Sequence, residues 1–119
     1  MKIAITAQGN TPDSAVDPRF GRAAWLLIHD DSNDAWECID NAAGRDTAHG
    51  AGIQAAQKVA DQQAETLLTG AIGPKAFASL QAAKIRIFHG AKGTALEALE
   101  AFKAGQLKEA SEMDATGGV

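Results

Sequence analysis

Cysteine is nearly absent from this chain, since Cys38 is the only one among its 119 residues. A single cysteine excludes an internal disulfide. It also excludes a zinc finger or a protein-ligated iron–sulfur cluster, because such sites need about four good ligands. Cys38 lies in the alternating stretch WECI at residues 36–39, which predicts a strand. We therefore interpret Cys38 as a structural thiol and not as a functional one.

Long apolar runs and an excess of basic residues are also missing. No run approaches the roughly 18 apolar residues that a membrane-spanning helix needs, and no charged-then-apolar leader precedes the first strand. The formal net charge is -4, whereas nucleic-acid binding depends on clustered lysine and arginine. We therefore expect a cytoplasmic monomer that has no membrane span and does not bind nucleic acid.

The residue combinations that catalysis requires are missing as well. No serine or cysteine is paired with a spaced histidine and carboxylate in a recognisable arrangement. The first apolar stretch, KIAITA at residues 2–7, carries no acid, so the carboxylate cluster of a metal-dependent nuclease is absent. Asp13 and Asp17 lie in a loop, where we expect them to stabilise turns. The sequence therefore favours a binding protein over an enzyme.

The chain does contain enough apolar sequence for one α/β domain, because 45% of its residues are hydrophobic. Apolar runs and alternation predict strands at residues 2–7, 23–29, 35–40, 65–69 and 85–88. Helical spacing predicts three helices, with apolar faces made by Ile53, Ala56, Val59 and Ala60 in residues 50–63, by Phe77 and Leu80 after Pro74, and by Leu96, Leu99 and Phe102 before Gly105. We expect residues 1–105 to form the domain and residues 106–119 to form a polar, mobile tail.

This order of elements predicts a mixed five-stranded sheet flanked by about three helices. Two hairpins make the second strand antiparallel to the first and third, and helical crossovers make the fourth and fifth strands parallel to the first. The loops at residues 8–22, 41–49, 70–73 and 89–93 then leave the sheet at one edge, which we call the carboxyl edge. Ligands of open α/β sheets bind at that edge, so we expect the functional site there.

Two arginines lie close together in the first of these loops, in the segment DPRFGR at residues 17–22. On an acidic protein, Arg19 and Arg22 suggest a site for a compact anion, because a planar guanidinium group binds oxyanions or sulfide-rich anions well. The alternative interpretation is that both are surface charges around an ordered turn.

Glycines occur in pairs before each predicted helix. The pairs are Gly50 and Gly52, Gly70 and Gly73, and Gly90 and Gly93. Helix N-termini present unpaired N–H groups and partial positive charge, so three of them at one edge would form an anion site. The alternative is that these glycines only permit tight turns. Residues 50–55 also match the dinucleotide fingerprint G-x-G-x-x-A, but weakly, because they follow a long loop and lie outside the first βαβ unit.

Histidines and lysines flank the same turns. His49 and His89 should lie at the carboxyl edge, where each donates to a bound anion, ligates a soft metal or is a plain surface residue. Lys75 and Lys92 either add charge to the site or are solvated. His29 ends the reversed strand and should lie at the opposite edge, so we exclude it from the site.

These motifs occur together in a known family. The opening strand, the DPRFGR segment, the loop at Asn41, the segment HGAG at residues 49–52 and the segment GAIGP at residues 70–74 resemble the dinitrogenase iron–molybdenum cofactor biosynthesis family over roughly residues 1–105. The small size and the glycine pattern are most similar to its orange-protein subfamily, found in sulfate-reducing bacteria. The resemblance implies a ribonuclease-H-like sheet in the order 3-2-1-4-5 that has no nuclease activity.

The resemblance also implies a cargo, a non-covalently held molybdenum–copper sulfide cluster of high negative charge. A cluster whose metals are saturated by sulfide needs no protein thiolate; it needs N–H donors, cations and apolar walls that exclude water. We therefore predict a non-catalytic carrier without protein ligands to the metals. The predicted cluster-binding residues are Arg19, Phe20, Gly21, Arg22, Asn41, His49, Gly50, Ala51, Gly52, Gly70, Ile72, Gly73, Pro74, His89 and Gly90.

Two further expectations concern partners and the competing function. The resemblance implies association with cytoplasmic ATPases linked to cell division. The alternative to a cluster carrier is a regulatory or adaptor domain that binds a nucleotide or a partner protein at the same edge.

Overall fold

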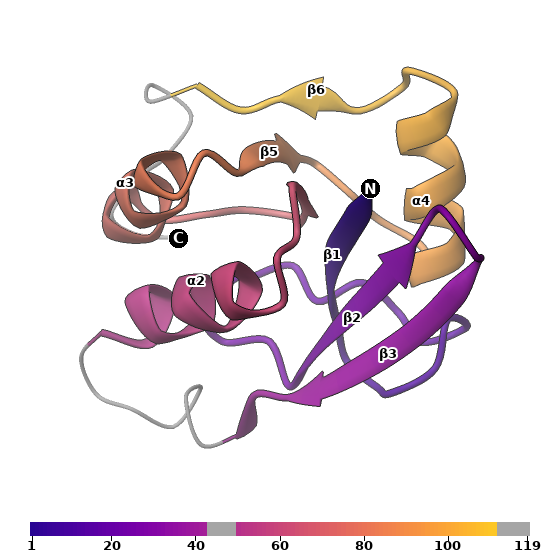
Figure 1. Cartoon of the computed structure of the whole chain (residues 1–119), viewed down its shortest axis with the longest axis horizontal. Coiled ribbons are helices and arrows are strands. Elements are labelled where there is room, and N and C mark those ends of the chain that lie inside the picture. Colours follow the sequence, from indigo (N-terminus) through magenta and orange to yellow (C-terminus); the bar gives the residue numbers. More distant parts are fainter. Residues whose placement is uncertain (43–49, 112–119) are drawn as a thin grey trace.

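A mixed sheet with helices on both faces forms the centre of the computed structural model, which describes residues 1–42 and 50–111 (Figure 1). Within these residues the strands and helices are β1 (Lys2–Ala7), β2 (Trp25–Asp30), β3 (Ala35–Asp40), α2 (Ala51–Asp61), β4 (Thr66–Leu68), α3 (Pro74–Ala82), β5 (Arg86–His89), α4 (Ala95–Lys103) and β6 (Lys108–Glu109). No helix in the described part of the chain is long and apolar enough to cross a bilayer.

The strand order β3-β2-β1-β4-β5-β6 confirms the predicted topology and extends it by one strand. β2 is antiparallel to β1 and β3, whereas β4 is parallel to both β1 and β5. All five predicted strands are present, and residues 108–109 of the expected tail add a sixth, β6, which pairs antiparallel with β5. Two residues are too few for a recognisable alternation, so sequence pattern alone could not identify this strand.

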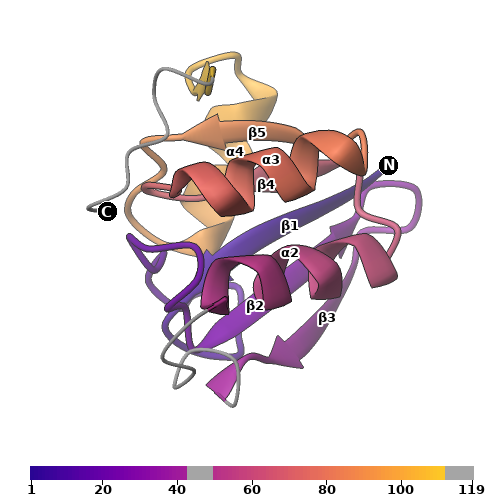
Figure 2. The ribbon, with the colours of Figure 1, turned by 90° about the vertical axis from the view of Figure 1, so that its left-hand side faces the viewer.

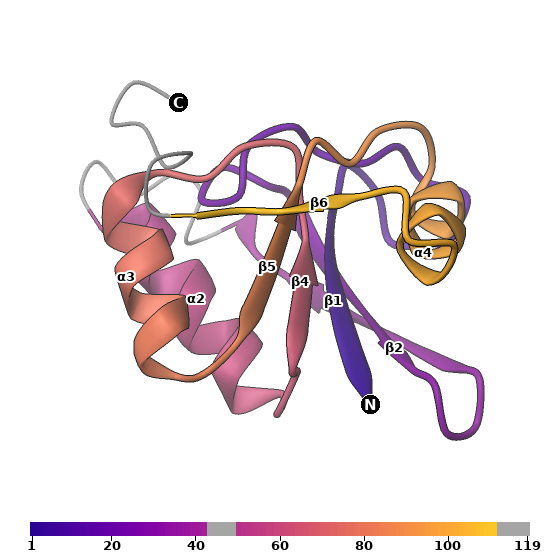
Figure 3. The same ribbon diagram turned by 90° about the horizontal axis from the view of Figure 1, so that it is seen from above.

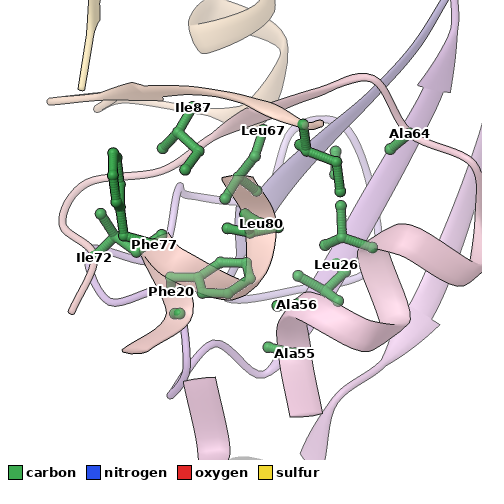
Figure 4. Packing of buried hydrophobic residues seen from close by; sticks show 14 of the residues in the cluster. Phe20, Leu26, Ala55, Ala56, Ala64, Leu67, Ile72, Phe77, Leu80 and Ile87 are labelled. Atoms are coloured by element: carbon green, nitrogen blue, oxygen red, sulfur yellow. The ribbon is translucent and has the colours of Figure 1, made fainter. Parts of the chain in front are cut away.

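The helices divide between the two faces of the sheet. Figure 2 shows α2 and α3 side by side on one face, and Figure 3 shows α4 on the other. Figure 4 shows the core under α2 and α3, where Phe20, Leu67, Phe77 and Leu80 pack together. A second cluster under α4 includes Ile3, Ile5, Leu68 and Leu99. β1 and β4 contribute to both clusters, as expected for strands that are covered on both faces.

Two apolar residues assigned to helix core faces are exposed instead. Ile53 is 46% exposed and Leu96 is 39% exposed. The buried residues of α2 are Ala51, Ala55, Ala56 and Val59, and those of α4 are Ala95, Ala98 and Leu99. The predicted residues Val59, Phe77, Leu80 and Leu99 are buried, so the expected faces are displaced at Ile53 and Leu96 only. Alanines take the neighbouring buried positions in α2 and α4, and a pattern that relies on large apolar residues does not detect them.

The two residues that we left out of the site lie elsewhere on the sheet, His29 toward the opposite edge and Cys38 within the outer strand β3. His29 is only 1% exposed, its Nε2 lies 2.7 Å from Asp34 Oδ1, and its ring centroid lies 4.8 Å from that of Trp36. Cys38 lies in β3, as predicted, and is exposed at the border of the sheet. Neither residue reaches the carboxyl edge.

Candidate functional site

The loop at residues 8–22 crosses the carboxyl edge and is anchored first at the ends of β1 and β4. The Asp17 N–H donates to the Thr6 carbonyl oxygen at 2.9 Å, and the Thr6 hydroxyl donates to the Asp17 carbonyl oxygen at the same distance. The Thr6 hydroxyl also lies 3.0 Å from the hydroxyl of Thr69, at a fully buried position. These buried polar contacts fix the loop because breaking them would leave unsatisfied groups inside the protein.

The same loop then packs directly against the turn after β4. Arg19 and Ala71 form an isolated parallel bridge, and the Phe20 N–H donates to the Ala71 carbonyl oxygen at 3.1 Å. Gly70 faces the backbone of Pro18 so closely that a Cβ on Gly70 would lie 2.7 Å from Pro18 Cα. Only glycine permits this approach, so the glycine predicted to open a turn instead permits a backbone-to-backbone contact.

Gly21 brings the loop against the start of α2. A Cβ on Gly21 would lie 2.8 Å from the Gly52 nitrogen and 2.9 Å from Gly52 Cα. Gly52 in turn faces α3, where a Cβ added to Gly52 would lie 3.0 Å from the Ala76 Cβ. Loop, α2 and α3 therefore meet through residues that have little or no side chain. We call the surface made by Arg19, Gly21 and residues 50–52 and 70–74 the edge site.

The first turns of α2 and α3 bring to the edge site backbone N–H groups that have no partner within their own helices. The N-cap residues are Gly50 and Gly73, neither of which has a side chain that could cap the helix, and Pro74 occupies the first turn of α3. The N–H groups of a helix's first turn lack partners within the helix and carry partial positive charge. Two such helix starts, packed together at one edge, attract an anion.

The third helix does not contribute, and our prediction of three available N-termini was wrong for α4. The Ala95 N–H donates to the Ser14 carbonyl oxygen at 2.9 Å, and the Leu96 N–H donates to the Pro12 carbonyl oxygen at 3.0 Å. Thr94 and Glu97 form a capping box that uses a further N–H of the first turn. The loop itself therefore satisfies the start of α4, which sequence spacing could not reveal.

Positive and apolar surface surrounds the edge site. Arg19, Arg22 and Lys75 are all exposed, and Lys75 lies in the first turn of α3. Asp17 accepts a hydrogen bond from the Arg19 backbone N–H at 3.1 Å, as expected for a turn-stabilising aspartate. Exposed apolar surface comes from Pro18, Pro74 and Ile53, the last in the first turn of α2.

Three predicted site residues have clear structural functions. Phe20 and Ile72 are buried in the core between the sheet and the helices α2 and α3 (Figure 4). Asn41 is fully buried; its Nδ2 donates to the Ala23 carbonyl oxygen at 2.8 Å, and its Oδ1 accepts from Lys58 Nζ at 2.7 Å. These residues hold the loops in place beneath the surface.

The remaining predicted residues are separated from the edge site or not described. His49 lies outside the described residues, as does most of the loop at 41–49. His89 and Gly90 line a cavity on the α4 side of the sheet, although the Gly90 N–H donates to the Gly70 carbonyl oxygen at 2.9 Å. Within the described residues, no group of three histidine, cysteine or acidic side chains could hold a metal ion.

Sequence reasoning missed Pro18, Ala71 and Ile53 as surface of the edge site. The side chains of Pro18 and Ala71 carry no polar group, and both residues contribute through their backbones. Their residue types therefore did not indicate a place in the site. Ile53 was assigned to the core from helical spacing. Its position directly after the glycine pair was the one available signal that it belongs to the first turn of α2.

Comparison with known proteins places these features in a family. Residues 1–105 match the family model described as dinitrogenase iron-molybdenum cofactor. The apo form of the orange protein from Desulfovibrio gigas is 46% identical, with a TM-score of 0.89 and 92% coverage of both chains. A NifB-like protein from Thermotoga is 32% identical, with a TM-score of 0.81 and 91% coverage of both chains.

One more distant structure supports the fold alone. A protein from Methanocaldococcus jannaschii described as a dinitrogenase is 18% identical, with a TM-score of 0.67 and coverage of 93% of this chain and 95% of its own. No curated protein matches this chain.

Proposed function

Because this chain belongs to the dinitrogenase iron–molybdenum cofactor family, we propose that it is a non-catalytic carrier of an anionic molybdenum–copper sulfide cluster. The cluster is cargo held without covalent bonds at the edge site. The observation that carries the proposal is the meeting of the loop, α2 and α3 through glycine backbone, next to two helix starts with no side-chain caps.

The chemistry of the donors fits a cluster that brings its own ligands. A metal ion bound by the protein would need several histidine, cysteine or acidic side chains together, and the described part of the chain holds no such group of three. A sulfide-saturated cluster instead needs N–H donors and positive charge around its outer sulfides. The backbone of residues 50–52 and the first turn of α3 supply the donors, and Arg19 supplies charge.

The absence of side chains at the centre of the edge site also supports a bulky anion. A cluster is wider than a single oxyanion, so it can approach several backbone N–H groups only where side chains do not intervene. Gly21, Gly52 and Gly70 keep the backbones of three segments in contact. The exposed apolar surface of Ile53 and Pro74 would shield one side of the cluster from water, which strengthens the electrostatic contacts.

The proposal is tested by titrating the apo-protein with tetrathiomolybdate and cuprous ion while visible absorption is recorded. Arg19→Gln should weaken cluster retention about tenfold or more, because a charge-assisted contact in a partly buried site contributes on the order of 1.5–3 kcal/mol. Arg19→Lys should restore part of the loss, since a point charge cannot reproduce the planar fork. The matched control is Lys84→Gln, which removes one charge from an exposed position at the opposite edge.

Two results would contradict the proposal. The first is equal retention by the parent, Arg19→Gln and Lys84→Gln, because the cluster would then bind elsewhere or only by general charge. The second is a colourless parent after reconstitution that binds ATP saturably, with shifted amide signals at residues 50–52. That result would favour the nucleotide-binding regulatory domain, because a nucleotide adds no visible absorption.

A further inference from the structure

A cavity of about 370 Å³ is lined by residues of β5, α4 and β6 and of the segments between them. Figure 3 shows α4 on the face of the sheet opposite α2 and α3. The cavity is bounded by the end of β5 and the loop that follows, by α4, and by the segment that leads into β6. The lining residues are His89, Gly90, Lys92, Ala98, Ala101, Gln106, Leu107 and Lys108. Its volume falls within the range of small-molecule pockets, which is roughly 300–1,000 Å³.

The charge of this cavity is positive on a protein whose net charge is -4. None of its lining residues is acidic. Lys92 and Lys108 are both exposed, and neither side chain has a hydrogen-bond or ion-pair partner among residues 1–42 and 50–111. Two unpaired lysines at one cavity concentrate positive potential, which favours an anionic ligand.

Nearby acids do not neutralise these lysines, because they are engaged elsewhere. Glu109 follows Lys108, but its Oε1 lies 3.0 Å from Arg86 Nη2. Glu97, in the first turn of α4, accepts from the Thr94 N–H at 2.9 Å. Glu109 and Glu97 therefore have other partners, and the remaining acid of α4, Glu100, is exposed and is not among the residues that line the cavity.

The rest of the lining is small and apolar. Ala98 is buried and Ala101 half-buried on the sheet-facing side of α4, and Leu107 packs against the apolar cluster beneath that helix. The Gln106 side chain adds an amide that can donate to an anion. A ligand that matches this lining has one charged end and a short apolar body, whereas a bare inorganic ion would leave the apolar part uncovered.

We propose that this cavity binds a small organic anion, in which a carboxylate or phosphate group is attached to a short apolar body. The charged group contacts Lys92 and Lys108, and the body packs against Ala98, Ala101 and Leu107. The inference does not depend on the proposed cluster carrier, because none of the residues that line this cavity belongs to the edge site.

The test uses the full chain labelled with ¹⁵N and four probes: 3-phenylpropionate, phenyl phosphate, the neutral 3-phenylpropanamide, and inorganic phosphate. We expect saturable shifts in the amide signals of Gly90, Ala101 and Leu107 with at least one organic anion. Whichever of 3-phenylpropionate and phenyl phosphate binds more tightly shows whether the cavity prefers a carboxylate or a phosphate group. The neutral amide and inorganic phosphate should each bind at least tenfold more weakly than that anion.

Two variants and a control complete the test. Lys92→Gln combined with Lys108→Gln should weaken binding of the organic anion at least tenfold, whereas Lys84→Gln should leave it unchanged. Ala101→Leu should abolish binding with both lysines intact, because the larger side chain fills the cavity. The proposal is overturned if neither organic anion binds saturably, if the neutral amide or inorganic phosphate binds equally well, or if the double lysine variant binds like the parent.

Discussion

Replacing Gly21 by alanine tests whether the edge site depends on contact between two backbones. The added Cβ would lie 2.8 Å from the Gly52 nitrogen, and ordinary Cβ contacts begin at 3.4 Å. The loop and the start of α2 must therefore separate by about 0.6 Å, and overpacking of this kind costs about 1–3 kcal/mol. For a domain of this size we expect the melting temperature to fall by roughly 3–15 °C.

The same displacement should weaken cluster retention, because it moves the N–H groups of α2 relative to the loop. Both quantities are measurable on one sample, by thermal unfolding and by the visible titration. Gly9→Ala is the matched control, since it lies in the same loop and its Cβ would meet only the side chain of Ser14 and no backbone: the Ser14 Oγ can move by giving up its exposed contacts with Thr11, and the Ser14 Cβ, at 3.1 Å, needs a shift of a few tenths of an ångström. The control should lose less than about 1 kcal/mol and should retain the cluster.

The reasoning is refuted if Gly21→Ala unfolds and binds cluster like the parent, because backbone contact would then be unimportant. It is also refuted if Gly9→Ala causes the same losses, since any change in the loop would then suffice. A stable Gly21→Ala protein with weakened retention would still support the edge site, because the position of the donors would have changed without loss of the fold.

Two further predictions concern residues outside the edge site. A hydrogen bond from Lys103 holds the pKa of Asp31 below its ordinary 3.8. The contact therefore stabilises the folded protein at pH values above 3.8, and this stabilisation is lost as the pH falls through the lowered pKa. Lys103→Met should raise the pKa of Asp31 toward 3.8 in a carboxyl NMR titration, and an unchanged pKa would show that the contact is absent in solution. Cys38→Ser should bind cluster with the parent's colour, because Cys38 is exposed on β3; a colourless, folded variant would make Cys38 a ligand.

The sheet could be predicted from the sequence because its strands carry local signals. β1, β2 and β3 are short apolar or alternating stretches with polar turns between them, and hairpin and crossover rules then determine their directions. The helix faces could be predicted less well, because alanine is buried as readily as it is exposed in a helix. We assigned Ile53 and Leu96 to the core because they are large and apolar, whereas the buried positions beside them are alanines, whose residue type does not indicate burial.

The meeting of three segments at one edge could be predicted from the sequence, whereas the binding function of that edge stays a prediction. The loop at 8–22 and the turns at 50–52 and 70–74 do meet at the carboxyl edge, as the topology required. Which groups face outward depends on contacts between distant segments, such as the Phe20 N–H with the Ala71 carbonyl oxygen. A contact between distant segments also removes α4 from the predicted site. Two carbonyl groups of the loop about 80 residues earlier accept hydrogen bonds from N–H groups in the first turn of α4.

A site built from backbone constrains what it can recognise. Side-chain ligands select a metal by their chemistry, whereas N–H groups of a loop and two helix starts select by charge and shape. Substitutions that keep the charge of the protein but alter the separation of Gly21 from Gly52, or of Gly70 from Pro18, should therefore affect binding more than substitutions of most side chains nearby. The exception is Arg19, whose guanidinium group is the side chain of the edge site that offers fixed positive charge beside those backbones. The backbone separation set by glycine and the positive charge of arginine thus contribute separately to cluster binding. Gly21→Ala measures the first contribution, and Arg19→Gln measures the second.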